Sequence, residues 1–320
     1  MEKTYNVLCI GVLVMDIMAK PVPVTIFEDD TTITEHMITS LGGDAANEAV
    51  ICSKLVGKTG LIAKVGDDMA GNQLIKILRE EGVDTRNIRK TSDLDTSMSI
   101  VLINSVGERC FIAAKNRSND FFCKDDFDIH IIKETRVLSY GGMYHMTRFD
   151  PDAPDIMKYA QDNGVITIAD CIRDIHGLGD PYARRMLPHI DYFVPSFVEA
   201  KNILGTENLL EMTTRFRSYG CPNVIIKLGA QGVFIDSPAF QGIVPTFLDA
   251  PVKDTTGAGD NFVAGFICAL LEGRKIEDAA LFANAAASIS IGEIGATAAV
   301  QNREQINHFL ENHTTGCVYK

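Results

Sequence analysis

The stretch KDTTGAGDNFVAGF, residues 253–266, combines residue types that could handle a phosphate group. Gly257, Ala258 and Gly259 form a segment without bulky side chains, and an almost wholly apolar run follows Asp260. A glycine-rich loop in front of a helix presents backbone N–H groups at the positive end of the helix dipole, which holds phosphate oxygens without cationic side chains. The stretch therefore predicts an anion hole at residues 257–259.

Asp260 is the acid that such a site would need. In the first turn of a helix the dipole favours the carboxylate form, so we expect Asp260 to accept a proton at neutral pH. An acid that only caps the helix is the alternative. Beside an anion hole, an ionised acid could deprotonate a hydroxyl that attacks a γ-phosphate, whose developing charge the N–H groups would take up. The combination predicts phosphate transfer to an alcohol.

Two other phosphate-binding loops fit less well. A Walker A loop requires a first glycine, but the stretch that ends in Gly57-Lys58-Thr59 has Cys52 in that place. A dinucleotide-binding fingerprint requires a third glycine where Phe262 stands, and it belongs after the first strand of a fold. Neither loop explains the stretch.

The elements that must position these residues follow an alternating order. We expect residues 254–259 to form a loop, followed by a helix over 260–273. From about residue 130, apolar β-rich runs alternate with helical stretches, which indicates a doubly wound, mostly parallel sheet with helices on both faces. The runs are 135–143, 151–164, 165–171, 181–190, 191–196, 197–205 and 223–229.

Two segments depart from this alternation. Residues 12–40 and 95–117 are rich in Val, Ile and Thr and have little helical periodicity, so we expect antiparallel strands there. As two insertions they would build a small β-sheet lid over the ends of the main strands, although edge strands of the main sheet are the alternative. No Pro/Ser linker or repeat interrupts the chain, so we expect a single domain over 1–320.

The composition excludes several classes of function. The chain has 320 residues, 46% of them hydrophobic and 22% charged, and a formal net charge of -12. A nucleic acid would meet a repulsive field over most of such a surface, so we expect no nucleic-acid partner. No apolar run approaches the ~18 residues of a membrane span, and the N-terminus does not resemble a signal peptide. We expect a cytoplasmic protein without a membrane partner.

The motifs of the chain together resemble the ribokinase family, also called the PfkB family of carbohydrate kinases. The stretch DTTGAGDNFVAGF at 254–266 is similar to the C-terminal signature of that family. Further matches follow one another along the chain: GVLVMDI at 11–17, SLGGDAANEA at 40–49, KVGDDMAGNQLIKILREEGVDT at 64–85, KLGAQG at 227–232 and FANAAASI at 282–289. The resemblance implies a ribokinase-like α/β fold with a β-lid, and transfer of the γ-phosphate of ATP, with Mg²⁺, to a sugar or nucleoside hydroxymethyl group.

The resemblance also implies roles for the matching residues. Asp260 corresponds to the catalytic base, and Gly257, Ala258 and Gly259 correspond to the anion hole. The positions that hold the sugar hydroxyls match Asp16, Gly42, Gly43 and Asn47. Asp and Asn side chains suit vicinal hydroxyls, because a carboxylate accepts hydrogen bonds and an amide both donates and accepts them. For the two glycines, a plain turn into a helix over 44–56 is the alternative.

Nucleotide and metal positions follow in the same way. The turn Lys227 to Gly232, which includes Gly229, resembles the one that passes the nucleotide, Asn284 resembles a position beside the adenine, and a purely structural role is the alternative for each. Glu199 resembles the acid that acts on Mg²⁺ through water, while Ser196 stands where many members have an Asn that contacts ATP. Asp254 and Thr256 match the ligands of a monovalent cation such as K⁺, although a capping role explains Asp254 equally well.

The chain departs from ribokinase itself at two places. Asp44 stands where ribokinase has a Lys, and Met143, Tyr144 and His145 occupy the region of its substrate-binding Glu. These changes argue against ribose as the substrate. Arginines in or near the lid and after the strands could serve an acidic or phosphorylated sugar, and solvated surface residues are the alternative for each; they are Arg109, Arg117, Arg148 and Arg173.

Three functions remain open from the sequence. The first is an ATP-dependent sugar kinase that acts on a primary hydroxyl. A nucleoside kinase of the same fold would need an aromatic clamp for the base, for which Phe27, Phe111 and Tyr144 are the aromatic residues in or near the lid. A catalytically inactive sugar- or nucleotide-binding regulator is the third, and the retention of Asp260 argues against it. We also expect a homodimer through the lid, because open sheet edges often pair.

Overall fold

The structure, a computed structural model, describes residues 3–28, 30–106 and 108–315. Within these residues nine strands form one large sheet in the order β13-β12-β11-β10-β9-β8-β1-β4-β5. The strands from β11 to β5 pair in parallel, and β12 and β13 add an antiparallel edge. The strands are β1 (Tyr5–Gly11), β4 (Thr59–Gly66), β5 (Ile88–Thr91), β8 (Thr135–Met143), β9 (Ile166–Cys171), β10 (Tyr192–Phe193), β11 (Asn223–Lys227), β12 (Val233–Asp236) and β13 (Gln241–Val244).

Helices cover both faces of this sheet, as the alternating order predicts. One core packs α1 (Asp44–Val56), α2 (Met69–Glu80), α7 (Ala258–Leu271), α8 (Ile276–Ser290) and α9 (Arg303–Asn312) against the sheet. The other face carries α3 (Ala153–Asp162), α4 (Gly179–Met186), α5 (Phe197–Leu204) and α6 (Leu209–Ser218). Short 3-10 turns lie at η1 (Ser118–Phe121), η2 (Lys124–Asp126), η3 (Ile129–Glu134), η4 (Leu187–His189) and η5 (Gly229–Gln231). The prediction of a doubly wound, mostly parallel sheet is confirmed.

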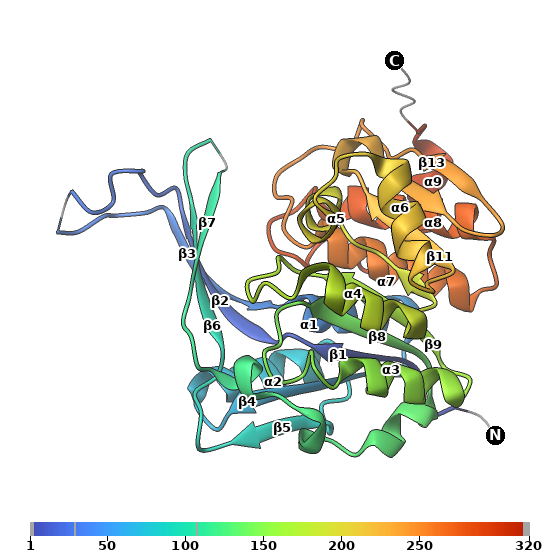
Figure 1. Cartoon of the computed structure of the whole chain (residues 1–320). Coiled ribbons are helices and arrows are strands. Elements are labelled where there is room, and N and C mark those ends of the chain that lie inside the picture. The colour runs from blue at the N-terminus through green and yellow to red at the C-terminus, as the bar shows by residue number, and fades with distance from the viewer. Residues whose placement is uncertain (1–2, 29, 107, 316–320) are drawn as a thin grey trace.

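The two predicted insertions form a separate small sheet that projects from the body (Figure 1). Its strands are β2 (Val14–Lys20), β3 (His36–Gly42), β6 (Met98–Ile103) and β7 (Arg109–Ala113), in the order β3-β2-β6-β7. The expectation of antiparallel strands is wrong for one pair, because β2 and β6 run in parallel. Each comes from a different insertion and leaves the body in the same direction, so no hairpin joins them. This small sheet is called the lid below.

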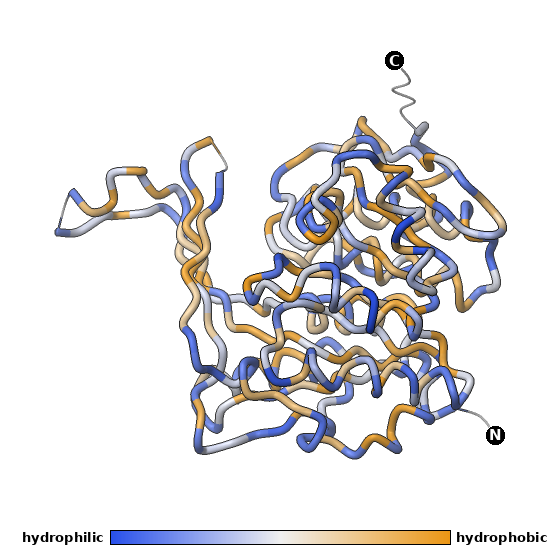
Figure 2. Tube along the Cα trace, viewed as in Figure 1, coloured by the Kyte–Doolittle hydropathy of each residue, from blue (hydrophilic) through white to orange (hydrophobic). Residues whose placement is uncertain are grey.

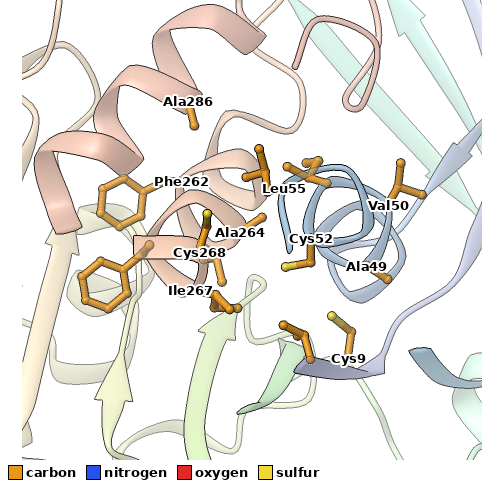
Figure 3. Close-up of a cluster of buried hydrophobic side chains, with 14 of the residues drawn as sticks. Cys9, Ala49, Val50, Cys52, Leu55, Phe262, Ala264, Ile267, Cys268 and Ala286 are labelled. Carbon is orange, nitrogen blue, oxygen red and sulfur yellow. The ribbon is translucent and has the colours of Figure 1, made fainter. Parts of the chain in front are cut away.

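Buried helix α7 is fixed by its neighbours on both sides. Figure 3 shows the α7 side chains Ala264 and Cys268 facing Cys52 and Leu55 of α1, with Phe262 on the side of α7 away from α1. A Cβ atom added at Gly265 would lie 3.0 Å from Ala286 Cβ of α8, so the two helices approach closely. A helix that is apolar all round must be buried, and burial here fixes the direction of its N-terminus.

Hydropathy follows the layers of the fold. Figure 2 shows apolar segments concentrated in the strands and inner helices of the body, and further apolar segments along the strands of the projecting lid. Apolar residues in the body are accounted for by the two cores on either face of the sheet. Among the residues that the structure describes, no helix has the length and apolar character needed to cross a membrane.

Candidate active site

The candidate site begins at the N-terminus of α7. The helix begins at Ala258, two residues earlier than the sequence predicted, so Ala258 and Gly259 belong to its first turn. Gly257 is the N-cap and has φ 74°, and a Cβ atom there would lie 2.4 Å from Ala296 Cβ. Glycine is therefore required by both backbone conformation and space. The N–H groups of a first turn have no acceptor within the helix, and that of Ala258 makes only a long hydrogen bond of 3.4 Å to the Thr255 carbonyl, so this turn can offer donors to a ligand.

Asp260 lies in the same turn and is only 7% exposed. Its Oδ2 accepts a hydrogen bond of 2.7 Å from the Nδ2 amide of Asn47, in the first turn and a half of α1. Asn47 was predicted to hold sugar hydroxyls, and the structure places it directly against the predicted base. Among the described residues, Asn47 Oδ1 is buried without a hydrogen-bond partner, so it could accept one from a ligand.

The protonation of Asp260 differs from the expectation based on the helix dipole. Burial raises its pKa to about 7, with a further upward contribution from the charges of Asp170 and Glu199. The hydrogen bond from Asn47 and the positive charge of Lys227 oppose this rise without cancelling it. The dipole argument omitted desolvation and the neighbouring acids, which outweigh a favourable helix terminus. A pKa near the working pH is the range in which a general base is most effective.

Other acids gather around Asp260. Carboxylate oxygens of Asp44, Asp170 and Asp260 all lie within 4.8 Å of one another. Lys227 Nζ donates a hydrogen bond of 2.5 Å to Asp170 Oδ2, and this ion pair is buried. Burial and the charge of Asp260 raise the pKa of Asp44 well above its usual range. The site therefore gathers three acidic side chains around one lysine, and their crowding favours the protonated form of Asp44.

Sequence reasoning did not assign Asp44 or Asp170 to the site. Asp44 was noted only as a departure from the ribokinase pattern. A signal for Asp170 was present, because it follows an apolar run at the carboxyl end of a parallel strand, where ligands of open α/β sheets bind. For Asp44, the signal was its place directly after the Gly42-Gly43 pair.

Next to this cluster lies a cavity of about 610 Å³. All the residues predicted to contact the nucleotide line it, namely Ser196, Lys227, Gly229, Gly232 and Asn284. Its polar end is formed by Asp44, Asp170, Glu199, Lys227, Ala258, Gly259 and Asp260, and apolar side chains elsewhere in the lining include Val233, Phe247, Leu248, Ala250, Val252 and Ile291. A cavity with an apolar part and a phosphate-type helix N-terminus has the two environments that a nucleotide needs.

Three of these lining residues also have structural partners. Asn284 Nδ2 donates to the carbonyl oxygens of Val244 and Pro245, each at 3.0 Å, and so fixes the chain after β13. Ser196 and Glu199 form a capping box at the start of α5, in which the Ser196 N–H donates to Glu199 Oε2 at 2.7 Å. These contacts set the shape of the cavity wall.

The residues predicted to hold the sugar lie between the lid and this cavity. Asp16 on β2 accepts a hydrogen bond from the Ser99 hydroxyl on β6, and burial raises the pKa of Asp16. A Cβ atom at Gly42 would lie 2.0 Å from Asp16 Oδ2, so only glycine allows this approach. Gly43 is the N-cap of α1, with φ 95°. The structure thus pairs Asp16 with Gly42 at the base of the lid, and Asn47 with Asp260 one turn into α1.

Asp254 and Thr256, the predicted cation ligands, lie in the loop just before the predicted anion hole at 257–259. Asp254 Oδ1 accepts hydrogen bonds from the Thr256 N–H at 2.9 Å and the Thr256 hydroxyl at 2.7 Å. Arg109 of the lid reaches the same loop and donates to the hydroxyl of Thr255 at 2.7 Å. Neither Asp254 nor Thr256 lines the nucleotide cavity, whereas Thr255 does.

Proteins of similar sequence are kinases of small carbohydrates. The family profile described as pfkB family carbohydrate kinase matches residues 4–303. A ribokinase of Arabidopsis thaliana is 28% identical over 300 residues, which cover 89% of this chain and 76% of that protein. A 5-dehydro-2-deoxygluconokinase of Geobacillus kaustophilus is 26% identical over an alignment of 333 residues, gaps included, which covers 98% of this chain and 96% of that protein.

Solved structures confirm the ribokinase-like fold that the motifs predict. The Arabidopsis thaliana ribokinase complexed with ribose and ATP superposes with a TM-score of 0.78 and 25% identity, over 97% of this chain and 99% of that chain. A fructokinase with bound ATP from Xylella fastidiosa shares the fold with a TM-score of 0.84 and 22% identity, over 97% of this chain and 98% of that chain. The chain therefore belongs to the pfkB family of carbohydrate kinases and is a phosphotransferase that acts on an alcohol group.

Proposed function

We propose that the protein is an ATP-dependent sugar kinase that transfers the γ-phosphate of ATP to a primary hydroxyl of a sugar or sugar derivative. One observation carries the proposal: the buried Asp260 carboxylate, held by Asn47, lies in the same helical turn as the Ala258 and Gly259 backbone at the wall of the 610 Å³ cavity. A proton acceptor and N–H groups that could donate to phosphate thus lie in the same helical turn. The ribose and ATP bound to the Arabidopsis thaliana ribokinase support the same pair of substrates.

In the proposed reaction Asp260 acts as general base. The acceptor hydroxyl gives its proton to an Asp260 carboxylate oxygen as its own oxygen forms a bond to the γ-phosphorus. The bond between that phosphorus and the bridging oxygen of ADP breaks, and ADP leaves with the electron pair. First-turn N–H groups of α7 would stabilise the charge on the transferred phosphoryl group. Positioning and electrostatics supply most of the catalysis in this type of transfer.

Charge at the polar end supports a divalent cation alongside ATP. Four carboxylates line that end, from Asp44, Asp170, Glu199 and Asp260, whereas Lys227 there already pairs with Asp170. Polyphosphate would add further negative charge, so a hard cation with oxygen ligands is needed to balance it. Glu199 fits the role of binding Mg²⁺ through water, because its carboxylate lines the cavity and is fixed by the Ser196 N–H. When bound, Mg²⁺ would neutralise phosphate charge.

For the acceptor we propose Asp16, Gly42, Gly43 and Asn47 as the residues that hold sugar hydroxyls. Asn47 supports this role most directly, because its unpartnered Oδ1 is buried beside Asp260 and would be satisfied by a donating hydroxyl. Asp16 offers a half-enclosed carboxylate at the base of the lid, where hydroxyl donors are suitable partners. A hydroxyl bound between them would lie within reach of the base.

A sugar is favoured over a nucleoside by the positions of the aromatic residues. Tyr144 is fully buried, and its hydroxyl donates to the Gly179 carbonyl at 3.1 Å, so its ring belongs to the core. Phe27 is 93% exposed and Phe111 is 58% exposed. Of these three residues, strand register places Phe111 on the lid face that carries Asp16, and a single ring does not form a clamp on both sides of a base.

We further propose that two copies pair through the lid. By strand register, exposed apolar side chains of three lid strands lie on the face opposite Asp16; they are Met37, Met98, Ile100 and Ile112, and they are between 38% and 68% exposed. A second copy would bury this face and the open edges of β3 and β7.

A screen for ADP release tests the kinase function. Ketoses, aldoses, sugar acids, phosphosugars and nucleosides would each be offered with MgATP. We expect a sugar to be phosphorylated, and Asp260→Asn to lower turnover on the order of 10²- to 10⁴-fold while sugar and ATP binding persist. Asp93→Asn, at an exposed loop position, is the matched control. Near-wild-type turnover of Asp260→Asn would refute the assignment, and ligand binding without any ADP release would favour a regulator.

A further inference from the structure

The loop Asp254 to Thr256 has its polar groups already engaged. Besides the two bonds from Thr256, Asp254 Oδ2 accepts a hydrogen bond of 3.1 Å from the Gly295 N–H. Burial raises the pKa of Asp254, but these hydrogen bonds and the charge of Arg109 outweigh it, so the net shift is downward. An ionised and mostly buried carboxylate requires a positive partner. Here the positive partner is a side chain of the protein itself, that of Arg109.

Arg109 reaches this carboxylate from the lid. It is the first residue of β7, and strand register places it on the same face of the lid as Asp16. Its Nη1 lies 3.7 Å from Asp254 Oδ1 and donates to the Thr256 hydroxyl, while Nη2 donates to the Thr255 hydroxyl at 2.7 Å. One guanidinium thus spans all three residues of the loop.

We propose that Arg109 takes the place of the monovalent cation predicted at Asp254 and Thr256. A K⁺ ion at Thr256 Oγ1 and Asp254 Oδ1 would compete with Arg109, because Nη1 donates to Thr256 Oγ1 and lies 3.7 Å from Asp254 Oδ1. A guanidinium is always charged and presents its N–H donors in a fixed fork, which suits adjacent hydroxyl and carboxylate acceptors. The proposal rests on the kinase function, since the loop leads directly into the anion hole.

Arg109 acts here as a positioning residue. Thr255 lines the nucleotide cavity, and Thr256 precedes Gly257, the N-cap of α7. On its other side the loop is fixed by the segment after α8, through the Lys253 N–H, which donates to the Ile291 carbonyl at 2.8 Å. The lid arginine therefore completes the support of the turn that donates to phosphate. A displaced lid would remove that support, so the position of the lid and the geometry of the anion hole are coupled.

Dependence on monovalent cations tests the proposal. Rates of ADP release would be measured in KCl and in choline chloride at equal ionic strength, so that screening is the same in both salts. We expect the wild type to differ by less than about twofold between the salts, and Arg109→Ala to lose about tenfold in choline chloride and regain about fivefold or more in KCl. The salt dependence of Arg109→Lys should lie between that of the wild type and that of Arg109→Ala. Arg117→Ala removes an arginine that follows the lid in the chain and pairs with Asp95, and it should not change the salt dependence.

A second measurement needs no acceptor sugar. Thermal unfolding and MgATP titration would be followed in the same two salts for the wild type and Arg109→Ala. We expect KCl to raise the Tm and the ATP affinity of Arg109→Ala alone. Strong KCl activation of the wild type would overturn the proposal. Equal weakening of ATP binding by Arg109→Ala in both salts would also overturn it, because the arginine would then act on the nucleotide itself. If no acceptor were phosphorylated, the kinase function would fail while these shifts still tested the cation site.

Discussion

Asp260 is an acid whose protonation is set by the side chains packed around it. Burial, Asp170 and Glu199 disfavour its charge, while Asn47 and Lys227 favour it, and the balance is a pKa of about 7. A base with this pKa is available at neutral pH and is strong enough to attract a hydroxyl proton as the transfer begins. The same balance makes its ionisation sensitive to small changes in pH.

The pH dependence of the proposed reaction follows from this value. Since the base must be deprotonated, we expect kcat/KM to rise about tenfold per pH unit below pH 7 and to level off above it. Rates with the phosphorylated sugar, measured from about pH 5.5 to 8.5, would show the inflection. Lys227→Met removes the neighbouring positive charge and should move the inflection to higher pH. A profile that is flat between pH 5.5 and 8.5 would contradict the role of Asp260.

Asp260 should also cost the protein stability. Its pKa is about 7 in the folded state against about 3.9 in an unfolded chain, so the folded state binds more protons between these values. The protonated group therefore leaves stability unreduced below about pH 4, and this stability is lost as the pH rises through about 7 and the buried group ionises. We expect the free energy of unfolding of Asp260→Asn to exceed that of the wild type by about 1–3 kcal/mol at pH 8 and by less at pH 5. Urea unfolding at both pH values would measure this, and a gap that shrinks as the pH rises would count against it.

At the scale of elements, α7 and the turn before it carry the proposed base and the proposed phosphate-binding N–H groups. The helix is buried by α1 and α8 (Figure 3), so its first turn cannot shift without repacking the core. Asn261 Nδ2 ties the turn down by donating to the carbonyl oxygens of Gly257 at 2.8 Å and Ala296 at 2.7 Å. Packing behind and hydrogen bonds in front hold the proposed phosphate donors in one place before any ligand binds, and electrostatic catalysis requires such preorganised donors.

Substitution of Gly257 tests this unit. Gly257→Ala places a Cβ atom at φ 74° and 2.4 Å from Ala296 Cβ, so we expect a loss of about 2–4 kcal/mol in stability and of about tenfold or more in turnover. Gly273→Ala is the control, because Gly273 has φ 77° at the other end of the helix with open space around it. It should cost about 1 kcal/mol and leave turnover unchanged. Equal effects of the two variants on turnover would show that the turn has no catalytic role.

The whole molecule places the residues of the proposed site where the body and the lid meet. Asp260 and Lys227 come from the body, and Asp16 and Arg109 come from lid strands that project from it (Figure 1). Asp16 and Arg109 share one face of the lid with the exposed side chains of Ile38 and Phe111, and the four exposed apolar side chains of the proposed interface lie on the other face. Motion of the lid would therefore change access for the acceptor and, through Arg109, the support of the anion hole.

The proposed dimer is a prediction about the apolar lid face. We expect light scattering to give twice the mass of one chain for the wild type, and Ile100→Glu to give the mass of one chain because a buried unpaired charge is costly in an interface. Phe111→Glu is the matched control, since Phe111 is equally apolar and exposed but lies on the opposite face. A monomeric wild type would refute the pairing, and dissociation by Phe111→Glu alone would place the contact on the other face.

The sequence by itself determined the features that depend on neighbouring residues. Alternating apolar and helical runs predict the βαβ order because each pattern has its own period and both can be recognised locally. Glycines followed by Asp260 predict a helix N-terminus that binds phosphate, because loop, acid and helix are consecutive. The residues predicted to contact the nucleotide all line one cavity, since their motifs lie at strand and helix ends that face the same edge of the sheet.

Only the tertiary structure decided which distant residues meet. Lys227 and Asp170 are 57 residues apart, Asp260 and Asn47 are 213 apart, and Arg109 and Thr256 are 147 apart. No local pattern specifies these pairs, because the order of strands in the sheet and the packing of α1 against α7 bring them together. The pKa of Asp260 and the proposed role of Arg109 depend on those contacts. They follow from burial and the distances between charges, which a sequence does not contain.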